Sequence, residues 1–178
     1  MNLFILRHAS AGLRRANPLL DNKRPLDKEG KRYCLQLAHI LNALNVQFDL
    51  VVSSPLKRSL QTASLVGNET GYEAQILQTP ALSPSATFKD FQQLLHDFAD
   101  RENILIVGHN PNITTFLGAL LVPPGTPTTP TVRLRKGSLA RVTTGRGSAV
   151  LQTVLDPRLV RALYATSTKS SRRKTSRK

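Results

Sequence analysis

Two short apolar runs, each ended abruptly by a histidine, constrain most strongly what this chain can fold into. The run at residues 3–6 ends at Arg7-His8, and the run at residues 104–107 ends at Gly108-His109. Such runs are typical of buried parallel strands, and an open α/β sheet binds ligands beyond the carboxyl ends of its strands. The sequence therefore predicts that Arg7, His8 and His109 meet at one crevice suited to an anion, above all a phosphoryl group.

The pattern between and after these runs predicts a single α/β domain. Helices are expected from Asp27 to about residue 44, from Ser54-Pro55 to about residue 65, from Thr87 to about residue 98, and from about residue 111 to residue 121. Further strands are expected at residues 49–53, 74–78, 132–135, 138–142 and 149–154, and a long loop at residues 9–25. Strands alternating with helices, followed by hairpin strands, predict a three-layer α/β/α fold whose mixed sheet is mostly parallel with an antiparallel edge.

The charge of the chain is concentrated at its C-terminus and near the expected crevice. The domain is expected at residues 1–160, followed at residues 161–178 by a basic tail that is predicted to be disordered, since it has little to bury. The net charge of the 178 residues is +14. We interpret the tail as a solubilising end, with weak binding of nucleic acid or another polyanion as the alternative. A second basic group, Arg14, Arg15, Lys23 and Arg24, would steer anions toward the crevice.

Several features favour a cytoplasmic protein that does not contact a membrane. No apolar run approaches the roughly 20 residues that span a bilayer. The N-terminus lacks the basic segment and the longer apolar stretch of a signal peptide. Cys34 is the only cysteine, which excludes an internal disulfide and a zinc site made of cysteines.

A third motif lies between the two histidines and completes a family pattern. Residues 53–63 read Ser-Ser-Pro-x-x-Arg-x-x-x-Thr-Ala, with Arg58 early in the expected helix. Together with Arg7-His8 and the Gly-His-Asn-Pro at residues 108–111, this order resembles the histidine phosphatase superfamily, which has a phosphoglycerate mutase-like fold. The resemblance covers roughly residues 2–155. The short chain and the Arg-Pro-Leu-Asp-x-x-Gly at residues 24–30 resemble most the phosphohistidine phosphatase SixA group.

The resemblance implies a role for each matching residue. His8 would be the nucleophile that accepts the phosphoryl group, Arg7, Arg58 and His109 would surround its oxygens, and Arg24 would lie at the rim. A neutral imidazole attacks through one nitrogen when the other is held protonated, and guanidinium forks match phosphoryl oxygens. Two arginines and a protonated His109 would therefore stabilise the transfer without a metal or other cofactor. Ser10 and Asn110 border the expected pocket and are candidates for hydrogen bonds to substrate.

Two departures from the family pattern bear on the substrate. Ala9 follows the nucleophile where a glycine is usual, and Ala81 stands where a glutamate is common, in a segment at residues 79–85 without a carboxylate. That glutamate protonates the leaving oxygen, a contribution of roughly 10²–10⁴-fold. The nitrogen that leaves from a phosphoramidate departs more easily than the alkoxide that leaves from a monoester. The missing acid therefore favours phosphohistidine in a signalling protein over a phosphate monoester.

Three functions stay open from the sequence. The first is dephosphorylation of a protein that carries a phosphohistidine domain. The second is a phosphatase of small phosphorylated molecules that uses Asp21 in the long loop as its acid. The third is a polyanion-binding module that kept the fold and lost turnover. The oligomeric state does not follow from the sequence.

Overall fold

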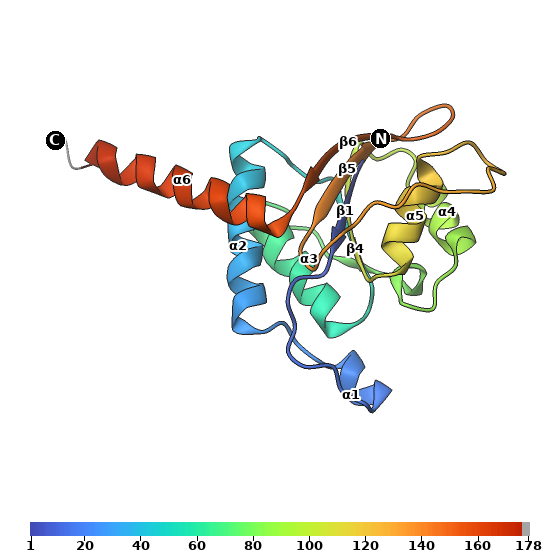
Figure 1. The fold of residues 1–178 in the computed structure, drawn as a ribbon, viewed down its shortest axis with the longest axis horizontal. Helices are drawn as coiled ribbons and strands as arrows, with labels where there is room; N and C mark the ends of the chain where they lie inside the picture. The colour runs from blue at the N-terminus through green and yellow to red at the C-terminus, as the bar shows by residue number, and fades with distance from the viewer. Residues whose placement is uncertain (176–178) are drawn as a thin grey trace.

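The computed structural model describes residues 1–175, and the side chains of residues 1–168. Its strands are β1 (Asn2–Arg7), β2 (Leu50–Ser53), β3 (Leu77–Gln78), β4 (Asn103–Gly108), β5 (Leu139–Thr143) and β6 (Val150–Leu155). Its helices are α1 (Pro18–Asn22), α2 (Lys28–Ala43), α3 (Lys57–Glu69), the 3₁₀ helix η1 (Pro80–Leu82), α4 (Phe88–Asp97), α5 (Asn112–Leu120) and α6 (Pro157–Thr175). Figure 1 shows their arrangement.

The strands form one mixed sheet in the order β3-β2-β4-β1-β5-β6. Strands β1, β2, β3 and β4 pair in parallel, whereas β5 pairs antiparallel with both β1 and β6. This confirms the predicted sheet with its antiparallel edge. In the pairing of β1 with β4, Arg7 lies opposite Gly108, so that both strands end at the same edge of the sheet.

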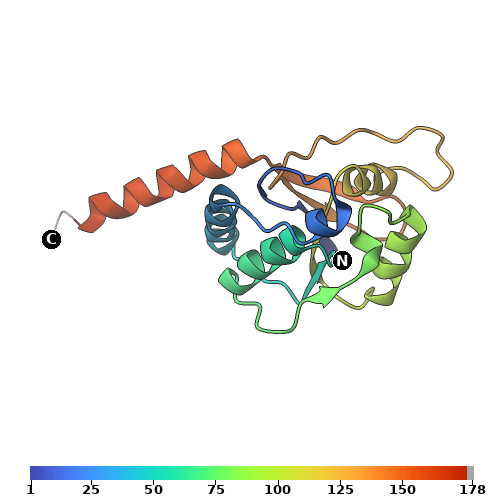
Figure 2. The same ribbon diagram turned by 90° about the horizontal axis from the view of Figure 1, so that it is seen from below.

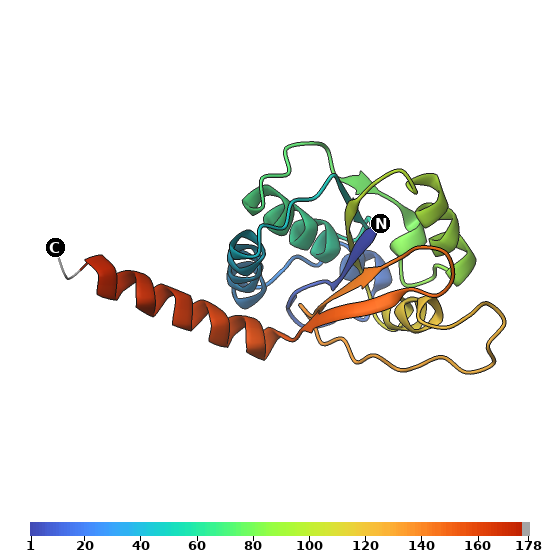
Figure 3. The same cartoon turned by 90° about the horizontal axis from the view of Figure 1, so that it is seen from above.

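Helices cover both faces of the sheet, as the predicted three-layer fold requires. Successive strand residues point to opposite faces, and in β1 Phe4 and Leu6 pack into one apolar cluster while Leu3 and Ile5 pack into the other. The first cluster includes buried residues of α2, α3 and α6, and the second those of α4 and α5. Figures 1 and 3 show the two layers on either side of the strands.

The helix starts follow local capping chemistry at two positions and tertiary contacts at a third. Asp27 caps α2 by accepting a hydrogen bond from Gly30 N, and Thr87 caps α4 within a capping box, both as predicted. In contrast, α3 begins at Lys57 rather than at Ser54-Pro55. The reason is that Ser54 N donates to Val107 O at 3.1 Å, which extends the pairing of β2 with β4 by one residue.

Three other segments differ from the sequence prediction. The expected loop at residues 9–25 contains α1, and the expected strand at residues 74–78 shrinks to β3. No strand is assigned at residues 132–135 within the described chain. There the Leu134 carbonyl accepts side-chain hydrogen bonds from Arg7 and Asn110, and Arg135 N donates to the Ser138 hydroxyl. Side chains thus replace the partners that a strand ladder would supply.

The C-terminal segment also corrects a prediction. Residues 161–178 were expected to form a disordered tail, but α6 continues to Thr175, and residues 176–178 lie outside the described residues. The first half of α6 is held by α2, because Tyr164 packs against the core and edge-on to His39, which also pairs with Ser167 at 2.9 Å. Figure 2 shows α6 extending away from the sheet. No helix in the described chain is both long and apolar enough to cross a membrane.

Gly30 lets α2 pack closely on the chain that leaves β1, and its replacement tests this packing. A Cβ at Gly30 would overlap the carbonyl oxygen of Ser10, which accepts a hydrogen bond from Asp27 N. Gly30→Ala should therefore lower the free energy of unfolding by about 1–3 kcal/mol, as measured by urea denaturation. In the control Gly145→Ala, the added Cβ meets open space and should change stability by less than about 1 kcal/mol. Equal stability of Gly30→Ala and the wild type would contradict this packing.

Candidate active site

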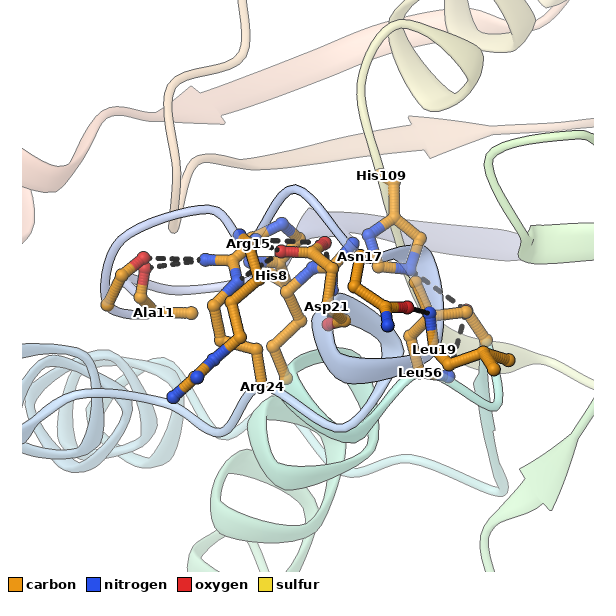
Figure 4. Close-up of polar contacts among 12 residues, drawn as sticks. His8, Ala11, Arg15, Asn17, Leu19, Asp21, Arg24, Leu56 and His109 are labelled. Atoms are coloured by element: carbon orange, nitrogen blue, oxygen red, sulfur yellow. Dashed lines mark hydrogen bonds and ion pairs between the residues drawn. The ribbon is translucent and has the colours of Figure 1, made fainter.

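The predicted residues meet in one pocket at the carboxyl edge of the sheet. His8 follows β1, His109 follows β4, and Arg58 lies in the first turn of α3. The pocket has a volume of about 830 Å³ and is lined at its base by Arg7, His8, Arg58 and His109. The loop that contains α1 passes over it, as Figure 4 shows for the residues labelled there.

The backbone fixes which nitrogen of His8 is free. The side chain is 6% exposed, and its Nδ1 lies 2.8 Å from the carbonyl oxygen of Ala9. Because a carbonyl only accepts hydrogen bonds, Nδ1 must carry the proton and Nε2 keeps its lone pair. Thr62 holds this segment from the other side, since its hydroxyl accepts a hydrogen bond from Ala9 N at 3.1 Å. The nitrogen of His8 that keeps a free lone pair is therefore Nε2.

His109 faces His8 across the pocket, with ring centroids 5.0 Å apart. Its Nε2 lies 2.9 Å from the hydroxyl of Ser54, which also accepts a hydrogen bond from Leu56 N. The hydroxyl keeps a second lone pair, so it can either donate to Nε2 or accept from it, and the ring proton lies on Nδ1 in the first case and on Nε2 in the second. Nδ1 is buried without a hydrogen-bond partner among the described residues. In the tautomer that carries its proton on Nδ1, this nitrogen is an unused hydrogen-bond donor.

Both imidazoles are neutral, which corrects the expectation of a protonated His109. The pKa of each ring is lowered from 6.5 to about 3, mainly by burial and in addition by the positive charges of Arg58 and Arg7. The hydrogen bond to Ala9 opposes this shift at His8 but does not reverse it. A neutral His8 is the nucleophilic form, and the positive charge around it comes from Arg7, Arg58 and Lys136.

Arg7, which is half-buried, and Arg58, which is buried, bring two guanidinium groups to the base of the pocket. One Nη1 donates to Leu134 O at 2.9 Å and the other to Asp21 O at 2.9 Å. The Nε atoms of both are buried without a partner among the described residues. Burial lowers the pKa of each, yet a guanidinium stays protonated in proteins. Both retain donors for a bound phosphoryl group.

Asp21 links Arg24 and Arg58 above the pocket. Its carboxylate lies 2.8 Å from Arg24 Nε and 3.3 Å from Arg58 Nη1, and accepts a hydrogen bond from Arg15 N at 2.9 Å. The hydrogen bond from Arg24 is the main cause that lowers the pKa of Asp21 to about 2, with the bond from Arg15 N next. A general acid must be protonated near neutral pH. An ionised Asp21 does not suit the role of acid expected from the sequence, and its carboxylate forms ion pairs with both arginines.

Of the other candidate residues, two line the pocket and one does not. Arg24 lines the rim, as predicted, and also donates to the carbonyls of Ala11 and Gly12, each at 2.7 Å. Asn110 lines the pocket and is held by its bond to Leu134 O. Ser10 does not line it, because its hydroxyl donates to Asp27 Oδ2 at 2.7 Å and so supports the start of α2. The structure therefore does not bring Ser10 together with the other candidate residues of the pocket.

Three further residues contribute to the pocket or support its side chains and were not among the candidates from sequence. Ser54 orients His109, Thr62 supports Ala9, and Lys136 adds a charge to the pocket lining. Thr62 belongs to the motif at residues 53–63, so its position in that motif was the available signal. Lys136 carries no such signal, since only the tertiary fold brings its turn to the pocket.

The described residues also bear on metal binding. Within them, no group of three or more histidine, cysteine, aspartate or glutamate residues is placed to hold a metal ion. The cationic groups named above are in a position to contact the oxygens of a phosphoryl group directly.

Sequence comparisons relate the chain to phosphatases. A profile of the histidine phosphatase superfamily (branch 1) matches residues 3–83. The chain is 31% identical to an uncharacterised protein of Picosynechococcus sp. over 123 residues, covering 67% of this chain and 73% of the relative. It is 29% identical to the phosphohistidine phosphatase SixA of Escherichia coli over 129 residues, covering 71% of this chain and 78% of the relative.

A structural comparison agrees with the fold and its layers. The protein histidine phosphatase SixA, solved in complex with tungstate, superposes with a TM-score of 0.76 and is 26% identical in sequence. The match covers 88% of this chain and 97% of that chain. The phosphoglycerate mutase-like architecture predicted from the sequence is thereby confirmed.

The protonation of the two histidines is open to direct measurement. With the pKa of each ring near 3, nitrogen-15 NMR should find His8 and His109 neutral from pH 8 down to pH 5, with the proton of His8 on Nδ1. The same rings in urea-unfolded protein should titrate near pH 6.5, which provides the internal control. Titration of either ring near pH 6.5 in the folded protein would show that burial does not set its charge.

Proposed function

The chain belongs to the histidine phosphatase superfamily, and from this premise we propose that it is a metal-independent phosphatase acting on phosphohistidine in a signalling protein. The observation that carries the proposal is the hydrogen bond from His8 Nδ1 to Ala9 O, which leaves Nε2 free in a buried, cationic pocket. We further propose that the protein acts in the cytoplasm.

In the first step, His8 Nε2 attacks the phosphorus of the substrate. The new N–P bond forms on Nε2 while the bond between phosphorus and the substrate imidazole breaks, and that imidazole takes a proton from solvent. Negative charge on the three phosphoryl oxygens is met by donors of Arg7 and Arg58, whose planar forks are already in place. Preorganised donors of this kind supply the largest part of such catalysis.

In the second step, water attacks the phosphorus of phosphorylated His8. The N–P bond breaks, inorganic phosphate leaves, and His8 Nε2 regains its lone pair. His109 Nδ1 lies on the opposite side of the pocket and can donate a hydrogen bond to a phosphoryl oxygen in both steps. The Ala9 carbonyl keeps the ring of His8 in one orientation and one tautomer throughout.

The choice of phosphohistidine rests on the missing acid. Among the described residues that line the pocket, Asp21 is the only carboxylate, and its pKa of about 2 keeps it ionised. An alkoxide leaving group would go without the proton it needs. An imidazole accepts a proton from water, so a phosphoramidate bond breaks without help. The similarity to SixA of Escherichia coli, which is named for this activity, supports the same substrate class.

The two other functions are less well supported. A small-molecule phosphomonoesterase is favoured only by the place of Asp21 in the pocket lining, and the ion pairs of Asp21 oppose it. Polyanion binding through the basic tail concerns residues 169–178, whose side chains lie outside the described residues.

The substrate class is tested by comparing two substrates without added metal. The protein should hydrolyse a phosphohistidine peptide and turn over a phosphoserine peptide far more slowly, since the pocket offers no acid to protonate the alkoxide that leaves from the ester. Loss of the nucleophile in His8→Ala should reduce peptide hydrolysis by at least about 10³-fold. His39→Ala, which changes an imidazole outside the pocket, is the matched control and should retain activity. Full activity of His8→Ala, or faster turnover of the ester, would overturn the proposal.

The role of Asp21 is tested by removing its charge. If it positions Arg24 and Arg58, Asp21→Asn should raise KM for the phosphohistidine peptide by roughly three- to tenfold and leave the shape of the pH profile of kcat unchanged. An acid would behave differently, because Asp21→Asn would then abolish the alkaline limb of that profile and lower ester turnover most. The steady-state parameters of both substrates from pH 5 to pH 9 separate the two roles.

A further inference from the structure

A second depression adjoins the candidate active site. It has a volume of about 510 Å³ and shares four lining residues with the first pocket: Gly12, Arg14, Arg15 and Arg24. The rest of its lining consists of Leu13, Pro25, Leu26 and Asp27. Arg14 and Arg15 therefore form a basic ridge, which faces the pocket of His8 on one side and the second depression on the other.

The cations of the basic ridge are free to bind an anion. Arg14 and Arg15 are both exposed, and neither forms an ion pair with another described side chain. The nearby carboxylates are already engaged, because Asp21 pairs with Arg24 and Arg58, and Asp27 accepts from Ser10 and Gly30 N. The ridge thus presents positive charge that the protein itself does not neutralise.

The phosphoryl group does not account for this charge. The base of the first pocket already offers Arg7, Arg58 and His109 to its oxygens, and Lys136 adds a further cation to the lining. The guanidinium groups of the basic ridge would therefore meet a second anionic group, carried by the substrate next to its phosphoryl group.

Exposed leucines on the same segment indicate what kind of substrate this is. Leu13 is 93% exposed and lines the second depression, and Leu19 and Leu20 of α1 are 73% and 51% exposed. A small anion or a nucleic acid backbone gains little from leucine side chains. A protein segment can bind to both the arginines and the leucines, because protein interfaces bury apolar side chains and are enriched in arginine.

We propose that Arg14 and Arg15 bind a carboxylate that flanks the phosphohistidine of a protein substrate, while Leu13 packs against an apolar side chain of the same segment. This inference rests on the proposed function and deepens it, since it names an acidic and apolar flank as the recognised feature. The phosphohistidine enters the first pocket, and the flanking residues lie across the basic ridge in the second depression.

The test compares two phosphohistidine peptides that differ only in carrying glutamate or glutamine at the flanking positions. The protein should prefer the glutamate peptide in kcat/KM by about three- to tenfold, the range expected of two exposed ion pairs. The double variant Arg14→Glu with Arg15→Glu should reverse this preference. The double variant Lys31→Glu with Arg32→Glu changes the net charge equally, on exposed residues of α2 that line neither pocket, and should keep it. Unfolding midpoints verify that both double variants fold.

Binding separates this inference from the proposed function. The affinity of His8→Ala for the same two peptides shows the preference even when no hydrolysis occurs. Preference in binding without hydrolysis by the wild type would refute the proposed function and keep the subsite. Hydrolysis of both peptides at equal rates would refute the subsite alone. A single-stranded oligonucleotide that displaces the glutamate peptide at lower concentration than the peptide itself would also overturn it, by assigning the basic ridge to nucleic acid.

Discussion

The parallel pairing of β1 with β4 is the constraint on which the site depends. Arg7 lies opposite Gly108, and His8 N donates to Gly108 O at 3.1 Å, so that His8 and His109 leave the sheet side by side although 101 positions separate them in sequence. A slip of one residue would turn the side chains of a strand to the opposite face. The alternate burial of β1 residues in two apolar clusters prevents such a slip, so the core itself sets the geometry of the two imidazoles.

Burial then determines which side chains of the pocket are neutral and which are charged. It keeps both histidines neutral at physiological pH, whereas the guanidinium groups of Arg7 and Arg58 stay charged because their intrinsic pKa is so high. Asp21 offsets part of that charge and holds Arg24 and Arg58 in place. The result is a nucleophile that is ready without prior deprotonation, surrounded by donors for phosphoryl oxygens but without a proton donor for a difficult leaving group. That combination is the basis for the proposal that the substrate carries a labile N–P bond.

The parts of the site that sequence could predict depend on local pattern. Strand ends place His8 and His109, and capping chemistry places Asp27 and Thr87, because each depends on a few neighbouring residues. The remainder depends on contacts distant in sequence. Ser10 donates to Asp27 rather than lining the pocket. Asp21 is kept ionised by Arg24 and Arg15 N of its own loop and by Arg58 of α3. Residues 132–135 form side-chain hydrogen bonds in place of a strand. The helix α6 likewise forms where α2 offers a surface to Tyr164, which composition alone does not reveal.

The central claim is that His8 accepts the phosphoryl group on Nε2, because Ala9 O holds the proton of Nδ1. The most direct measurement is to quench the protein at alkaline pH during turnover of a phosphohistidine peptide, then locate the phosphoryl group by mass spectrometry and phosphorus-31 NMR. We expect a single phosphorylated residue, His8, substituted at Nε2. A phosphoryl group on His109 or on Nδ1 of His8, or rapid turnover with no phosphorylated protein at any time, would contradict this account.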